Sequence, residues 1–163
     1  MIEIGINGLI RFLSYIAPFI IRRMYTQERL ASKVKIIVGS EGDGVYIQAG
    51  QLPRAQVWLE ITNLTPFPIE PDRVIVKLSC GQEIAKLTLL ERRVIQSTEE
   101  QRYLLEQNLT SFQVDALREQ SEITKAQLEI YGFFLSKVHN FSIINKYIST
   151  NNVRVVNLGL NKP

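Results

Sequence analysis

The chain has 163 residues, enough for one ordinary domain with an additional segment and too few for two domains of usual size. Hydrophobic residues make up 45% of it and charged residues 21%, a balance that excludes a disordered or low-complexity chain. The net charge of +3 is small, so we expect no nucleic-acid partner. A single cysteine, Cys80, and a single histidine, His139, exclude an intrachain disulfide and a Cys/His zinc cluster.

The first segment of the chain is strongly apolar. Thirteen of the twenty residues from Ile2 to Ile21 are hydrophobic, and Arg22 and Arg23 end the stretch. A helix of about twenty residues spans roughly 30 Å, the thickness of the hydrocarbon core of a bilayer. We therefore expect residues 1–30 to form an apolar helix in front of a separate domain, residues 31–163.

Polar or helix-interrupting residues recur through this segment at steps of three or four. They are Glu3, Asn7, Arg11, Ser14, Pro18 and Arg22. Because a helix advances about 100° per residue, these positions form one narrow stripe in an otherwise apolar surface. The stripe and Arg23 are the candidate contacts with membrane lipid or with another membrane protein subunit.

Three interpretations of the segment compete. A cleaved signal peptide carries its positive charge before the apolar run, whereas Arg22 and Arg23 follow it here. A core helix of a soluble domain usually buries a face of about 100°, and the apolar arc here is much wider. A membrane-associated helix, spanning the bilayer or lying in its interface, is favoured, and Arg11 then needs a partner or water. If the helix spans, the basic residues after it place the C-terminal domain on the cytoplasmic side.

From Lys33 onward, short runs alternate apolar and polar residues. The predicted strands cover residues 33–38, 45–50, 55–63, 73–80, 82–95, 125–138 and 152–159. Alternation of period two is typical of antiparallel sheets with one buried face. No long helical pattern separates the runs, which argues against a parallel α/β sheet. The predicted fold class is therefore mainly β, an antiparallel sandwich like an immunoglobulin or fibronectin type III domain.

Three other segments complete the predicted elements. Residues 101–109 predict a strand, although the segment 97–108 also fits a helix that begins with a capping box at Ser97. Residues 111–120 predict one short helix capped by Thr110 or Ser111. The Gly-rich residues 39–44 predict a hairpin turn, because they lack the lysine of a phosphate loop and the ligand spacing of a calcium loop.

Prolines crowd the segment 64–71. Pro66, Pro68 and Pro71 each lack a backbone donor and restrict φ. A paired central strand is therefore not expected here. The segment predicts a stiff crossover between two sheets, with Phe67 and Ile69 packed on the core.

The sequence from Ile61 to Ile95 resembles the late-embryogenesis-abundant group-2 domain, also called the water-stress and hypersensitive-response (WHy) domain. The family's turn is matched by Asn63, Thr65, Pro66, Phe67, Pro68 and Ile69. The hairpin that follows is matched by residues 72–78, Gly81, Ile84 and Ala85. Leu64 and Cys80 depart from the family pattern, which usually has proline and asparagine there.

This resemblance implies an antiparallel sandwich with one helix and no catalytic centre. We accordingly expect no enzyme activity, no cofactor, no metal and no small-molecule substrate. The predicted function is a membrane-tethered sandwich that acts through protein contacts or in stress protection. Two alternatives remain: a structural subunit of a membrane complex that contacts its partners through residues 1–24, and a small carrier of lipid or another hydrophobic ligand.

The remaining reactive side chains are given structural interpretations. His139 follows a predicted strand and is interpreted as a surface residue, and Cys80 as a small apolar residue of a strand. Asn-x-Ser/Thr sequons begin at Asn63, Asn108 and Asn140, and we interpret them as chance occurrences.

Overall fold

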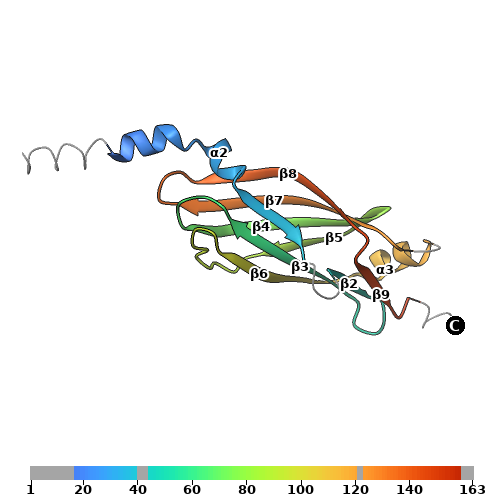
Figure 1. The fold of residues 1–163 in the computed structure, drawn as a ribbon. Helices are drawn as coiled ribbons and strands as arrows, with labels where there is room; N and C mark the ends of the chain where they lie inside the picture. The colour runs from blue at the N-terminus through green and yellow to red at the C-terminus, as the bar shows by residue number, and fades with distance from the viewer. Residues whose placement is uncertain (1–16, 40–43, 121–122, 159–163) are drawn as a thin grey trace, which may run out of the picture.

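Two β-sheets packed face to face form most of the computed structural model, which describes residues 17–39, 44–120 and 123–158 (Figure 1). The first sheet contains β1 (Val34–Val38), β2 (Val45–Gln48), β3 (Arg54–Asn63), β6 (Glu100–Asn108) and β9 (Val153–Val156). The second contains β4 (Ile69–Cys80), β5 (Gln82–Leu89), β7 (Ala126–Ser136) and β8 (Phe141–Thr150). The prediction of a mainly β sandwich is confirmed.

The core lies between the sheets and follows the alternation in the sequence. Val57, Leu59 and Ile61 of β3 are fully buried, and so are the alternate residues Val74 and Val76 of β4. Removing such side chains from water is the main favourable contribution to folding. The intervening residues of each strand form the outer faces of the sandwich.

In the first sheet, β3 is the central strand. β6 pairs with one side of β3. On the other side, β1 pairs with residues 59–63 of β3 and β2 pairs with residues 54–57. The hairpin predicted at residues 39–44 is therefore wrong, because β1 and β2 lie in line along β3 and do not pair with each other. Gly39 N donates to Trp58 O at 2.8 Å and Trp58 N donates to Gly44 O at 3.0 Å, so the chain leaves and rejoins the same edge of β3.

Two features of the C-terminal part depart from prediction. β8 was not predicted, because its alternation of apolar and polar residues breaks at Asn145, which has a φ of 55°. Phe141 at the start of β8 is buried, whereas Ile144 and Tyr147 further along it are exposed. β9 pairs parallel to β2, which makes one pair of the first sheet an exception to the antiparallel arrangement.

The proline-rich crossover is shorter than predicted, since β4 begins at Ile69 instead of residue 73. Pro71 is tolerated because it pairs with Phe134 of β7 at a register shift, and β5 pairs with β4 only from Val74 onward. β5 in turn ends at Leu89 and not at residue 95. The turn predicted at Gly81 is confirmed, with a φ of 79° that favours glycine.

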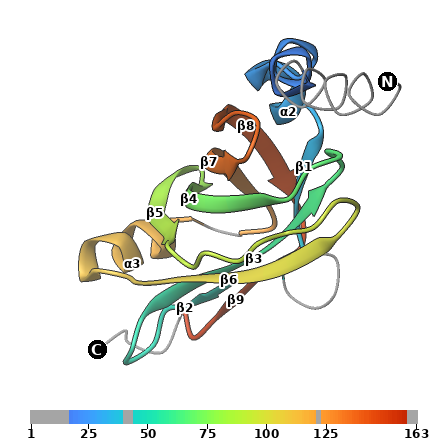
Figure 2. The same ribbon diagram turned by 90° about the vertical axis from the view of Figure 1, so that its left-hand side faces the viewer.

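Short helices lie at opposite ends of the sandwich (Figures 1 and 2). α3 (Ser111–Arg118) begins with the capping box of Thr110 and Gln113, which confirms the predicted helix and one of its two proposed caps. α2 (Gln27–Ala31) overlaps the end of the helix expected over residues 1–30, but Tyr25 and Thr26 separate it from the helical residues before it, and the fully buried Leu30 fixes it. Before it, residues 17–24 are helical. The stripe residues Glu3, Asn7, Arg11 and Ser14 lie outside the described residues.

Candidate functional site

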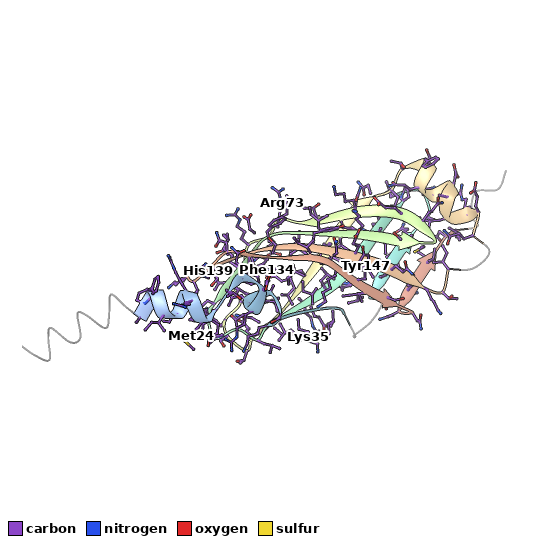
Figure 3. All side chains as sticks on the ribbon, turned by 90° about the horizontal axis from the view of Figure 1, so that it is seen from above. Met24, Lys35, Arg73, Phe134, His139 and Tyr147 are labelled. Atoms are coloured by element: carbon purple, nitrogen blue, oxygen red, sulfur yellow. The ribbon has the colours of Figure 1, made fainter. Side chains whose placement is uncertain are left out.

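We define the helix-bearing end of the sandwich as residues 17–33, the turn 64–68, the segment 90–99 and the turn 137–140. These segments meet because β3, β5 and β7 end there, while β1, β4, β6 and β8 begin there. Met24 and His139 lie near each other at this end (Figure 3). It is also where the sequence places its candidate membrane or partner helix.

The helical residues 17–24 expose large apolar side chains. Phe19 is 69% exposed, Ile20 48% and Met24 53%, and Arg22 and Arg23 are exposed beside them. A helix packed on a core would bury one apolar face. Here three large apolar side chains remain exposed, and clusters of exposed apolar side chains are typical of surfaces that contact a membrane or another protein.

The base of this helix is fixed on the sandwich. The rings of Tyr25 and Phe67 meet edge to face with centroids 5.0 Å apart, and the Arg29 guanidinium lies 5.6 Å from the Tyr25 centroid. Arg29 Nη1 also donates to Met24 O at 3.0 Å. These contacts join the helix to the proline-rich turn, so the sequence-predicted Phe67 packs here.

His139 provides a second attachment. Its Nε2 lies 3.0 Å from Arg22 O, a hydrogen bond that requires the proton on Nε2. His139 lies half-buried in the turn between β7 and β8, and its contact with the N-terminal helix was not predicted. The backbone of Arg22 is thereby bound to the β7–β8 turn, while its side chain remains exposed.

Asn63 organises the turn below the helix. Its side chain is fully buried, and its Nδ2 lies 2.8 Å from Phe67 O, 3.0 Å from Ile95 O and 3.1 Å from Gln96 O. Its Oδ1 accepts from Thr65 N at 2.9 Å and from Thr65 Oγ1 at 2.7 Å. One amide thus connects the turn 64–68 to the segment 90–99. The same burial leaves no room for a glycan at the Asn63 sequon.

The residues that match the WHy turn and hairpin do not form a single site. Pro66, Phe67 and Pro68 lie in the turn that Asn63 holds, whereas Gly81 lies at the opposite end of β4. Beside the turn is an open apolar hollow of about 290 Å³. It is lined by Pro68, Ile69, Glu70, Val94, Leu135, Ser136 and Lys137.

The described residues offer little reactive chemistry. Cys80 is buried, and burial raises the pKa of its thiol to about 11, so it is protonated at neutral pH. Within residues 17–39, 44–120 and 123–158, no group of three His, Cys, Asp or Glu residues could hold a metal ion.

None of the helices among the described residues has the length and apolar character needed to cross a membrane.

Comparison with known proteins does not place the chain in a family. No family model matches it, and no curated protein matches it. Similar solved structures include a structural-genomics target with a TM-score of 0.48 and 11% identity, over 72% of this chain and 84% of that one. They also include a putative late embryogenesis abundant protein, with a TM-score of 0.44 and 14% identity over 91% and 86% of the two chains.

A third similar structure is the putative ApaA protein of Bordetella pertussis, with a TM-score of 0.44 and 10% identity over 76% of this chain and 93% of that one. All three scores and identities are low. Similarities at this level do not indicate a function, so the function is inferred from the chain's own residues.

Proposed function

We propose that this protein is a non-enzymatic β-sandwich held at a membrane surface by its N-terminal segment, where it acts through protein contacts. The observation that carries the proposal is the exposure of Phe19, Ile20 and Met24 on a helix whose base is fixed to the sandwich. The attachment holds the apolar side chains away from the domain's own core. A lipid surface would remove them from water.

The charges beside these residues support the same proposal. Arg22 and Arg23 lie at the end of the apolar stretch, and each basic residue contributes about 1 kcal/mol near an anionic lipid surface. Lys33 and Lys35 follow Arg23 by ten and twelve residues. If the helix spans the bilayer, this basic excess places the sandwich on the cytoplasmic side.

The resemblance of the Asn63–Pro68 turn to the WHy domain supports stress protection as the setting for these contacts. Under the proposal, Asn63, Pro66 and Phe67 hold the helix base and do not bind a ligand. Another membrane protein subunit remains the alternative partner of residues 1–24.

Flotation with lipid vesicles tests the tether. The full chain should float with vesicles that contain phosphatidylserine, and a chain starting at Tyr25 should remain in the buffer. The triple variant Phe19→Ser/Ile20→Ser/Met24→Ser should bind more weakly because its apolar contact is lost.

A matched control uses exposed apolar residues at the other end of the molecule. Leu52 and Phe112 are 79% and 80% exposed, and Leu52→Ser/Phe112→Ser should leave flotation unchanged. If the full chain remains in the buffer, or if both sets of serine substitutions reduce flotation equally, the proposed tether is wrong.

A further inference from the structure

The outer face of the first sheet carries an exposed apolar centre. Trp58 of β3 and Leu104 of β6 pair directly across the strands, and each is 41% exposed. Ile37 and Tyr46 flank this pair from β1 and β2, opposite Glu60 and Gln56 respectively. α2 and α3 lie away from this face (Figure 2). An aromatic centre with a polar surround is typical of interaction surfaces.

Opposite charges lie at equal distances on either side of this centre. Arg102 and Glu106 each lie two positions from Leu104 on β6, in opposite directions and about 7 Å away along the strand. Arg102 Nε lies 3.2 Å from Glu60 Oε1, and Arg54 Nη1 lies 3.7 Å from Glu106 Oε1.

This arrangement is complementary to itself. A two-fold axis along the Trp58–Leu104 row would place Arg102 of one copy against Glu106 of the other, twice. The same operation brings Ile37 of one copy to Tyr46 of the other. We propose that this face binds a second copy of the chain, with Trp58 and Leu104 at the centre of the contact.

A hollow beside Trp58 fits the second copy's indole ring. It has a volume of about 190 Å³ and is lined by Gly39, Trp58, Leu59, Glu60 and Arg102. Gly39 keeps the hollow open, because a Cβ there would lie 3.1 Å from Trp58 Cβ. The buried Glu60 carboxylate at the wall can accept from an indole N–H.

The size of the face indicates a reversible pair. Residues 54–62 extend about 27 Å along β3, and three strands give a width of about 15 Å, or roughly 400 Å² per copy. The total of about 800 Å² lies below the roughly 1,200 Å² at which specific, stable interfaces begin, which fits a weak and transient pair. The axis also reverses the strand direction, so the helix-bearing ends of the two copies point in opposite directions. Two membrane-held copies would then pair across facing membrane surfaces.

Cross-linking of the full chain in detergent tests the axis without depending on the proposed membrane tether. A residue on a two-fold axis faces its own counterpart, and facing sheets lie about 10 Å apart, too far for a direct disulfide. Leu104→Cys should therefore form covalent dimers with a short bismaleimide that joins two thiols. Phe133→Cys is the matched control, since Phe133 is 48% exposed on the second sheet. The native Cys80 is only 1% exposed and should not react. We expect Leu104→Cys to cross-link at least about ten-fold faster, because pairing raises the effective thiol concentration.

A charge exchange in the Leu104→Cys background tests the partner. Two variants should each reduce cross-linking when tested alone, because like charges then meet across the axis. The first is Glu106→Arg, and the second is the double variant Glu60→Gln/Arg102→Glu. The Glu60→Gln change avoids leaving a buried carboxylate without its cation. Mixing the two variants should restore cross-linking, since both cross-axis contacts again join opposite charges. Equal rates for Leu104→Cys and Phe133→Cys, or no recovery on mixing variants shown by circular dichroism to be folded, would overturn the proposal.

Discussion

Asn63 is the residue whose side chain joins the most segments at the helix-bearing end. It is fully buried and contacts the carbonyl oxygens of Phe67, Ile95 and Gln96. Each of these carbonyls has a second donor, which is Thr65 Oγ1, Ile69 N and Glu99 N respectively. Asn63→Ala would therefore remove one of two donors from each carbonyl and take away the acceptor of the buried Thr65 N, and the free energy of unfolding should fall by about 2 kcal/mol. Urea denaturation followed by circular dichroism measures the change. Asn108→Ala, at an exposed position, is the control and should cost less than about 0.5 kcal/mol. Equal costs would contradict the assigned role of Asn63.

Glu129 predicts a pH dependence of stability. Hydrogen bonds from Tyr131, Tyr147 and Lys77 lower the pKa of its carboxyl to about 2, with Tyr147 Oη at 2.7 Å and Lys77 Nζ at 3.0 Å. Since the folded-state pKa lies below the ordinary one, the contribution is complete above about pH 5 and is lost as the pH falls towards 2. The stability difference between the native chain and Glu129→Gln should therefore shrink between these pH values. A difference independent of pH would contradict this.

At the scale of elements, the helix base depends on the contact between Tyr25 and Phe67. Phe67→Ala removes the edge-to-face contact, so the hydrogen bonds from Tyr25 N to Ile21 O and from Leu30 N to Thr26 O should open more often. Hydrogen exchange should become faster at these two amides, while the amides of β3 and β4 are unaffected. Phe112→Ala on α3 is the control. If exchange at Tyr25 and Leu30 does not change, the ring contact does not hold the helix.

Strands and helices that are specified by neighbouring residues were predicted from the sequence. The alternation of β3 and the capping box at Thr110 follow from neighbouring residues. β8 was missed because a positive φ at Asn145 changes which residues face the core. The hairpin at 39–44 was wrong because its outcome depends on β3, which pairs with both flanking strands.

The candidate site was only partly predictable for the same reason. The sequence singled out Asn63 and Phe67 as parts of a turn, but the partners Ile95 and Gln96 lie more than thirty residues away in the chain. The contact between His139 and Arg22 spans 117 positions. No local pattern in a single sequence encodes such pairs. The paired rows around Trp58 likewise emerge only once the register of β3 and β6 is known.

At the scale of the whole molecule, the two ends of the sandwich differ in the proposed arrangement. The helical residues 17–24 project from one end, and α3 with the exposed Phe112 lies at the other (Figure 1). A chain held at a membrane through the first end keeps the outer face of the first sheet accessible to protein partners.

Spin labels at the two ends test the membrane claim most directly. Cys80 is 1% exposed and should remain unlabelled, so Ile20→Cys and Phe112→Cys each provide one labelled site in the full chain. On vesicles containing phosphatidylserine, the label at position 20 should be accessible to oxygen and shielded from a water-soluble nickel complex. The label at position 112 should show the reverse. Equal exposure of both labels to the nickel complex would contradict the account.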